Sequence, residues 1–305
     1  MTLTPLERRC VENHRNAEAM EMRGRDTTNE TAWCEFGLRL MLEAGAMVRD
    51  MRLLSMAEIV KFKADGSPYT DQERRIESQI KEKLAQFCPE AVFVGEESGG
   101  KLPRQGRALA VDPVDGTWAL VNRSETCTTT FAFYQDNEAF LGMVQNPATG
   151  ELAYAGRESG ARLIQLSVFG EADIGRTLPC DRARPDSVLV NIQPQRDALR
   201  VAQELFVAWK DDDVSMLKLT GGSPSWSLLE TAKGSYVYVN LWTTKPSDPF
   251  DLEAGVLIVR GAGGDVTDLD GIPIDPTTHS GPFVAGVDAQ SRENVVERVK
   301  HALRD

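Results

Sequence analysis

The spacing of apolar residues predicts helices in the first part of the chain and strands after them. Between residues 30 and 54, apolar side chains recur at steps of three and four, which predicts an amphipathic helix. A second helix is predicted from about Asp71 to Phe87, with Thr70 as its N-cap. Short apolar runs bounded by glycine or proline follow at residues 91–94 and 108–111, and we interpret both as strands.

The middle of the chain is rich in predicted strands, and the last third alternates strands with helices. A β-meander is predicted over residues 128–134, 139–145 and 151–155. Further strands are expected at residues 187–192, 214–219, 236–241 and 283–287, and further helices at 196–210, 225–233, 251–261 and 291–303. This order of elements indicates an α+β or layered α/β fold.

Changes in composition divide the chain into three parts. Residues 1–29 are polar and of mixed charge without a clean period, so we expect a loosely held, partly helical extension. The break at Ala183-Arg184-Pro185 separates an N-terminal α+β half, residues 30–183, from a C-terminal α/β half, residues 184–305, that completes the site.

Charge and cysteine content narrow the possible partners and compartment. The 305 residues include 46 acidic and 34 basic ones, a formal net charge of −12. This balance disfavours nucleic acids and anionic membranes as partners, and an anionic substrate would need a cation between it and the protein. The sequence shows neither a long apolar run nor a secretory signal pattern, and its five cysteines are scattered, so we expect a cytoplasmic protein.

Acidic residues stand at three places where an apolar strand ends or an apolar helix begins. Glu96 and Glu97 follow one predicted strand, Asp112 and Asp115 follow the next, and Asp251 opens a helix. Carboxylate and carbonyl oxygens are the ligands that Mg²⁺ prefers. Each place alone would more often be an ordinary turn or a helix cap. The three together favour a metal site used for phosphoryl chemistry.

The three segments together resemble the inositol monophosphatase family, the magnesium-dependent, lithium-sensitive phosphatases. The segments are GEES at residues 95–98, DPVDGT at 112–117, and FDLEAG at 250–255 with GAGG behind it at 261–264. The resemblance extends from about Glu30 to the C-terminus. It implies an αβαβα layered sandwich that forms a homodimer.

The resemblance also implies roles for individual residues. The metal ligands would be Glu96, Asp112, the carbonyl of Val114, Asp115 and Asp251. The backbone N–H groups of Gly116 and Thr117 would hold the phosphate, and the Thr117 hydroxyl would orient the attacking water. Residues 63–70 resemble the mobile loop that closes over the site in this family.

Four positions in or near these motifs need separate interpretation. Glu73 stands where the family has an aspartate that supports a further metal and the nucleophile; it also forms a capping box with Thr70, and both roles are compatible. Asn240 stands where the inositol phosphatases place a glutamate that contacts a sugar hydroxyl. Ser223, in a Gly-Gly-Ser turn near the expected substrate position, is a candidate contact, and Trp242 is a candidate stacking group for a nucleotide.

The predicted function is hydrolysis of a small phosphorylated metabolite, an inositol, sugar or cyclitol phosphate, with two or three Mg²⁺ ions. Glu96, Thr117, Glu73 and Asp115 are the predicted catalytic residues. A nucleotide 3′-phosphatase and a histidinol-phosphate phosphatase are alternative enzymes. A non-catalytic binding or regulatory protein on the same fold is the alternative from another class, and the intact set of carboxylates argues against it.

Overall fold

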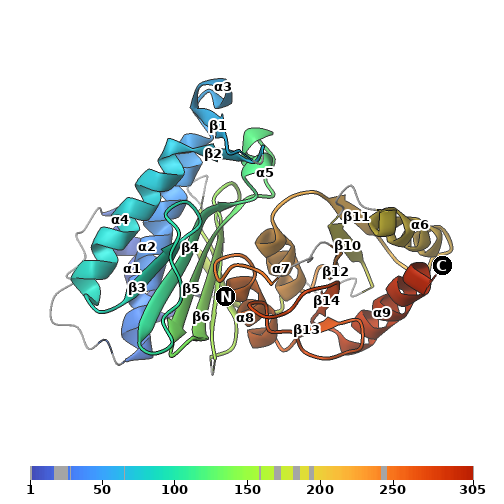
Figure 1. Cartoon of the computed structure of the whole chain (residues 1–305). Helices are drawn as coiled ribbons and strands as arrows, with labels where there is room; N and C mark the ends of the chain where they lie inside the picture. Colours follow the sequence, from blue (N-terminus) through green and yellow to red (C-terminus); the bar gives the residue numbers. More distant parts are fainter. Residues whose placement is uncertain are drawn as a thin grey trace.

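The computed structural model describes residues 2–16, 27, 29–64, 66–157, 159–167, 173–180, 186–191, 196–241 and 246–304. Helices and sheets alternate as five layers, which Figure 1 shows from one side to the other. Among the described helices, none combines the length and apolar character that crossing a bilayer requires.

Helices form the two outer layers and the central one. The first outer layer packs on the seven-stranded sheet and contains α1 (Pro5–Arg15), α2 (Glu30–Met51) and α4 (Asp71–Phe87). The central layer, α7 (Pro224–Lys233) and α8 (Glu253–Gly261), lies between the two sheets, and α6 (Arg196–Lys210) and α9 (Ala289–Arg304) cover the far side of the second sheet (Figure 1). The predicted αβαβα sandwich is therefore confirmed.

The seven-stranded sheet follows chain order from β3 to β9. Its strands are β3 (Val92–Gly95), β4 (Arg107–Asp115), β5 (Thr128–Gln135), β6 (Glu138–Asn146), β7 (Glu151–Gly156), β8 (Arg162–Gln165) and β9 (Ile174–Thr177). β3 and β4 are parallel, and every later pair is antiparallel. The predicted meander is confirmed as β5, β6 and β7, whereas β8 and β9 were not predicted.

The second sheet has five strands in the order β11-β10-β12-β14-β13. They are β10 (Val188–Asn191), β11 (Leu217–Thr220), β12 (Val237–Asn240), β13 (Asp265–Asp268) and β14 (Phe283–Gly286). β10 runs parallel to both β11 and β12, so the carboxyl ends of these three strands meet at one edge. β13 was not predicted. The predicted break at residues 183–185 lies outside the described residues.

Four short elements stand beside the end of β4. They are α3 (Met56–Ile59), β1 (Val60–Phe62), β2 (Pro68–Thr70) and α5 (Thr117–Val121), and β1 and β2 pair as an antiparallel ribbon. Figure 1 shows this ribbon next to α5, and the rings of Phe62 and Trp118 lie 6.1 Å apart between them. The segment between β1 and β2 therefore lies close to the DPVDGT motif.

The N-terminal segment is held more firmly than the sequence predicts. Helix α1 packs against α2, and its Glu7 is fully buried. The Glu7 carboxylate accepts hydrogen bonds from Arg162 Nε at 2.6 Å and from the Tyr154 hydroxyl at 3.0 Å. The prediction of a loose extension is wrong for Pro5–Arg15, because the partners of this buried acid lie about 150 residues away and no local pattern reveals them.

Small residues let the central helices approach the first sheet. A Cβ added at Gly142 on β6 would lie 2.7 Å from the backbone oxygen of Ala254 on α8. Any side chain at this position would collide with α8, so only glycine lets the helix pack this closely on the strand. Helix α8 is thereby seated directly on β6, and the segment that precedes it, which contains Asp251, is brought over the end of the first sheet.

Candidate active site

The predicted metal ligands all line one cavity. Glu96, Asp112, Val114, Asp115 and Asp251 surround a cavity of about 300 Å³. The same cavity is lined by the predicted substrate-side residues Gly116, Thr117 and Asn240. Four carboxylates from three separate chain segments thus converge on one place, as the motifs predict.

The DPVDGT segment is shaped by a break in the ladder between β4 and β5. The register shifts between Asp112 and Asp115, so the chain leaves regular pairing there. Asp112 Oδ1 accepts a hydrogen bond from the Val114 N–H at 2.8 Å, which closes a local turn. Gly116 follows at φ +87°, and a Cβ there would lie 3.0 Å from Ser223 Cβ. Glycine is therefore required for the turn to pass the start of α7.

Asp115 is fixed by the first residues of α7. Its Oδ2 accepts hydrogen bonds from Ser223 Oγ at 2.6 Å and from the Ser225 N–H at 2.9 Å, and Thr128 Oγ1 lies 3.5 Å away. Ser223 is also the N-cap of α7, bonded to the Trp226 N–H at 2.8 Å, and it is fully buried. The Ser223 hydroxyl thus donates to Asp115 and accepts from the backbone of α7. The predicted contact between Ser223 and the substrate stays a prediction.

Asp251 lies in the turn before α8 and does not cap the helix. The N-cap of α8 is Leu252, and Asp251 Oδ2 instead accepts a hydrogen bond from the Asp248 N–H at 3.0 Å. The Asp251 carbonyl accepts one from Ser225 Oγ at 2.7 Å. Since Ser225 also holds Asp115, the start of α7 joins the second and third motifs. The alternative interpretation of Asp251 as a helix cap is therefore wrong.

The loop after β3 carries Glu96 and Glu97, and Glu77 on α4 holds its backbone. Glu77 Oε1 accepts from the Glu97 N–H at 2.8 Å, and Glu77 Oε2 accepts from the Ser98 N–H at 2.9 Å. Lys63, from the segment between β1 and β2, contacts Glu96 Oε1 at 3.2 Å and also pairs with Glu97. The predicted loop thus reaches the first motif through a lysine.

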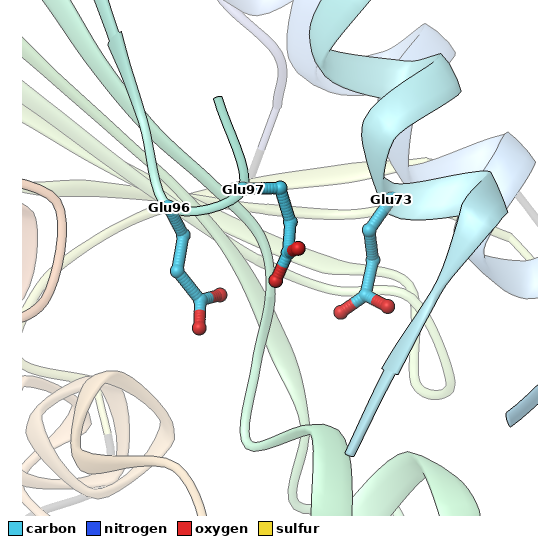
Figure 2. A group of neighbouring side chains, drawn as sticks. All are labelled: Glu73, Glu96 and Glu97. Atoms are coloured by element: carbon cyan, nitrogen blue, oxygen red, sulfur yellow. The ribbon is translucent and has the colours of Figure 1, made fainter. Parts of the chain in front are cut away.

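Glu73 caps α4 and also lies beside other residues of the site. It forms the capping box of α4 with Thr70, and its Oε1 lies 3.4 Å from Thr117 Oγ1. Figure 2 shows its carboxylate beside those of Glu96 and Glu97, all three pointing to the same side. One oxygen from each lies within 4.8 Å of the others. Capping therefore does not remove Glu73 from the site.

Burial and like charges raise the pKa of the central carboxyl groups. Burial is the largest cause for all three: it raises the pKa of Asp112 well above its usual range, that of Asp115 to about 6 and that of Asp251 to about 7. The charge of Asp115 adds to the rise at Asp251, while the bonds from Ser223 and Ser225 oppose the rise at Asp115. Such a group of buried oxygen ligands fits a hard divalent cation, which would offset their mutual repulsion.

Three residues that support the site were not found from the sequence. Glu77 and Ser225 hold the motif backbone and Asp115, and Asn191 lines the cavity from the end of β10. The sequence does contain a sign of Glu77, because an acidic residue lies there on the apolar face of α4, beside Ile76 and Ile80. It contains none for Ser225 and Asn191. The predicted stacking group Trp242 lies outside the described residues.

Comparison with known proteins places this site in a family. Residues 31–302 match the sequence profile of the Inositol monophosphatase family. Histidinol-phosphatase of Mycobacterium tuberculosis is 28% identical over 237 residues, which cover 74% of this chain and 82% of that protein. Inositol monophosphatase 2 of Homo sapiens is 28% identical over 254 residues, 78% of this chain and 81% of that one.

Solved structures share the fold. The IMPase of Thermotoga maritima superposes with a TM-score of 0.69 at 20% identity and covers 89% of this chain and 98% of its own. The extragenic suppressor protein suhB of Bartonella henselae gives a TM-score of 0.70 at 22% identity, over 88% of this chain and 98% of its own. Both are similar to this chain in architecture.

Proposed function

Because the chain belongs to the inositol monophosphatase family and is a phosphomonoesterase, we propose that it hydrolyses a small phosphorylated metabolite with Mg²⁺ as cofactor. The observation that carries the proposal is the convergence of Glu96, Asp112, Asp115 and Asp251 on one cavity. The raised pKa values of Asp112, Asp115 and Asp251 support occupation by a cation.

The residues divide naturally between two ions. Glu96, Asp112 and the Val114 carbonyl would hold one, and Asp112, Asp115 and Asp251 would hold the second. A third ion, if bound, would lie near Glu73, Glu96 and Glu97. When bound, ions of this kind lower the pKa of a water molecule and stabilise the charge that develops on the leaving oxygen.

The protein groups around that water would orient it and take its proton. We assign orientation to Thr117 Oγ1 and proton transfer to Glu73 or Glu96. Burial raises the pKa of Glu73 to about 7, with the charges of Glu96 and Glu97 adding to it, which suits a base that works near neutral pH. The N–H groups of Gly116 and Thr117 would hold the phosphate, with Asp115 and its hydrogen-bond partners fixing the turn.

The proposed substrate is the phosphate ester of an inositol, a sugar or a related cyclitol, and Asn240 is its proposed contact on the second sheet. A nucleotide 3′-phosphatase is the second candidate. The observation that favours it is Trp118, which lines the cavity and is half exposed, so that an aromatic base could stack on it. The histidinol-phosphatase relative supports histidinol phosphate as a third candidate.

We extend the proposal to assembly and location. A homodimer is proposed from the resemblance to the family, and light scattering on the purified protein measures it. A cytoplasmic location is supported by the five cysteines, all of which are free thiols. Expression as a fluorescent fusion in the source cell tests the location.

A panel of phosphate esters tests the proposed function. Phosphate release is measured with and without Mg²⁺ on inositol 1-phosphate, fructose 1,6-bisphosphate, 3′-phosphoadenosine 5′-phosphate and histidinol phosphate. We expect Mg²⁺-dependent release that is fastest with a sugar or inositol ester. Preference for the nucleotide would support the second candidate. Failure to release phosphate from any ester, while Mg²⁺ still binds, would contradict the proposal.

A further inference from the structure

Two arginines join the end of α2 to the chain that follows α5. Arg52 Nη1 donates to the Ser124 carbonyl at 2.7 Å, and Arg52 Nη2 donates to the Arg123 carbonyl at 3.2 Å. In return, Arg123 Nη1 donates to the Arg52 carbonyl at 2.5 Å, and Arg123 Nη2 donates to the Leu54 carbonyl at 3.0 Å. Each guanidinium thus binds the backbone of the other segment, and we call this reciprocal pair the arginine clasp.

The arginine clasp acts on the two residues that cap α5. The Arg123 N–H donates to the Leu120 carbonyl at 2.9 Å, and the Ser124 N–H donates to the Ala119 carbonyl at 2.8 Å. These two bonds form a Schellman motif, which satisfies the last carbonyl groups of a helix. The carbonyls of the same two capping residues accept the bonds from Arg52. Arg52 therefore holds the C-terminal cap of α5 from outside the helix.

Arg123 stands at a cap position where glycine is the usual residue. Its φ is +56°, in the left-handed region, where a side chain costs stability. Asp212 has the same place after α6, at φ +62°, and the Asp213 N–H behind it donates to the Ala208 carbonyl at 2.9 Å. At Arg123, the two bonds from the guanidinium to the end of α2 offset the cost of the left-handed backbone.

Helix α5 needs support from both ends, because it has only five residues and its own hydrogen bonds are too few to hold it. Its first residue is Thr117, to which we assign orientation of the water and a contact with the phosphate. Thr117 Oγ1 lies 3.2 Å from the Val114 carbonyl and 3.4 Å from Glu73 Oε1. At the other end, the clasp attaches α5 to α2, a 22-residue helix packed in the first core. The position of Thr117 therefore depends on the clasp.

The carboxylates of the cavity are held by other bonds. Asp115 accepts from Ser223 and Ser225 at the start of α7. The loop that carries Glu96 is held by Glu77 on α4. Loosening the arginine clasp should therefore displace Thr117 and leave the proposed metal ligands in place.

We propose that Arg52 and Arg123 are positioning residues for the hydrolysis, which hold Thr117 in place against the phosphate and the attacking water through the C-terminal cap of α5. This inference rests on the proposed phosphatase function. It adds to the site two residues from outside the described lining of the cavity. It also gives the left-handed arginine a purpose that a glycine could not serve.

Steady-state hydrolysis of p-nitrophenyl phosphate over a range of Mg²⁺ concentrations tests the inference. Arg123→Gly removes the guanidinium and suits the left-handed backbone, so the variant should fold. At a temperature where thermal unfolding shows each protein to be fully folded, we expect its kcat to fall about fivefold. The Mg²⁺ concentration for half-maximal activity should stay unchanged. Asp212→Gly is the matched control, because it makes the same change at the same cap position on exposed chain after α6, and its kcat should not change.

Variants of Arg52 test the other half of the clasp. Arg52→Met keeps the apolar stem and removes both bonds to the cap of α5, so kcat should again fall about fivefold. Arg52→Lys keeps one donor group within reach of the cap and should lose less activity than Arg52→Met.

A double-mutant cycle tests whether the clasp acts through Thr117. Arg123→Gly is combined with Thr117→Ala, and kcat is compared with that of Thr117→Ala alone. If the clasp serves to place the Thr117 hydroxyl, Arg123→Gly should lower kcat by less than about twofold once that hydroxyl is gone.

Failure of this inference can be distinguished from failure of the proposed function. Full kcat in Arg123→Gly and Arg52→Met, with only a lower unfolding temperature, would show that the clasp serves stability alone. An equal loss with and without the Thr117 hydroxyl, or a raised Mg²⁺ requirement, would also overturn the positioning role. Each of these results leaves the phosphatase function standing. If the unmodified protein releases no phosphate at any Mg²⁺ concentration, the proposed function is contradicted and this inference is overturned with it.

Discussion

The two sides of the cavity are built by different means. The side at the first sheet carries Asp112 and Asp115 within one short motif, whose turn is closed by a bond between Asp112 and the Val114 N–H. The side at the second sheet carries Asn191 and Asn240, which are 49 positions apart and are brought together by parallel strand pairing. The comparison teaches that a short sequence motif can group the carboxylates of one side, whereas the amide side chains of the other side are grouped only by the topology of a whole sheet.

The start of α7 connects the two sides. Ser223 and Ser225 bind Asp115, and Ser225 also binds the carbonyl of Asp251. Helix α7 packs on β12 at the same time. Under the proposed function, we expect substitutions of the carboxylates to lower the rate of catalysis and substitutions on the second sheet to alter the choice of substrate.

The largest loss of activity is expected from substitution of Asp115, one of the proposed metal ligands. Asp115→Asn should lower kcat for p-nitrophenyl phosphate by at least about 1,000-fold, because it removes a charged ligand from the proposed second ion. Folding should remain cooperative, since the amide oxygen can still accept the bonds from Ser223 and Ser225. Phosphate release and thermal unfolding measure the two effects. The exposed Asp211→Asn is the control, and full turnover in Asp115→Asn would refute the assignment.

A smaller loss is expected from Glu77, which holds the first motif without lining the cavity. Glu77→Gln keeps one acceptor and loses the other, so the loop that carries Glu96 should loosen. We expect kcat to fall about tenfold and the Mg²⁺ concentration for half-maximal activity to rise severalfold. Glu82→Gln, on the exposed side of the same helix, should change neither value. A loss of stability with an unchanged Mg²⁺ requirement would show that Glu77 serves only folding.

Substitution of Ser223 tests whether this residue positions Asp115 or contacts the substrate. Ser223→Ala removes the bond to Asp115 and the N-cap of α7, so kcat should fall severalfold and the free energy of unfolding by about 1 kcal/mol. KM should stay nearly constant across the esters of the panel. A change in KM that differs between esters would support the interpretation of Ser223 as a substrate contact. Ser78→Ala, exposed on α4, serves as the control.

The smallest effect on activity is expected far from the cavity, at Glu7. Burial alone would raise the pKa of this carboxyl, but its bonds with Arg162 and Thr4 and the Arg162 charge outweigh burial and place the pKa below its ordinary value of 4.5. The stabilisation by ionised Glu7 is therefore complete above pH 4.5 and is lost as the pH falls through the lowered pKa.

Urea unfolding of Glu7→Gln measures this contribution. At pH 7 the variant should be less stable by about 2 kcal/mol, because the charged hydrogen bonds from Arg162 are lost. The difference should shrink as the pH falls below 4.5, and kcat at pH 7 should be unchanged. A difference in stability that grows toward low pH would contradict the lowered pKa of Glu7.

Much of the fold could be predicted because its long elements follow local patterns. The helix predicted from Asp71 to Phe87 with Thr70 as its cap has these bounds in the structure, and so has the helix at Arg196–Lys210. The helix predicted over residues 30–54 ends at Met51. Strands β8, β9 and β13 were missed because polar or charged residues hold at least two of their four positions, whereas the equally short β10, β12 and β14 begin with three apolar residues.

The candidate site could be predicted where its residues are neighbours in sequence. Asp112, Val114 and Asp115 line the cavity together because they share one turn. Asn191 could not be predicted, because the apolar run of β10 resembles that of other buried strands and only its pairing with β12 gives it a place in the site. The role of Ser223 likewise depends on a contact that spans 108 positions.

The most direct test of the account is the metal dependence of phosphate release from p-nitrophenyl phosphate. The protein is treated with a chelator, dialysed, and assayed while Mg²⁺ is added back, with Asp115→Asn measured in parallel. The account predicts no release without metal, saturable recovery with Mg²⁺ in the unmodified protein, and no recovery in Asp115→Asn. Release that persists in the chelator-treated protein, or equal recovery in both proteins, would contradict it.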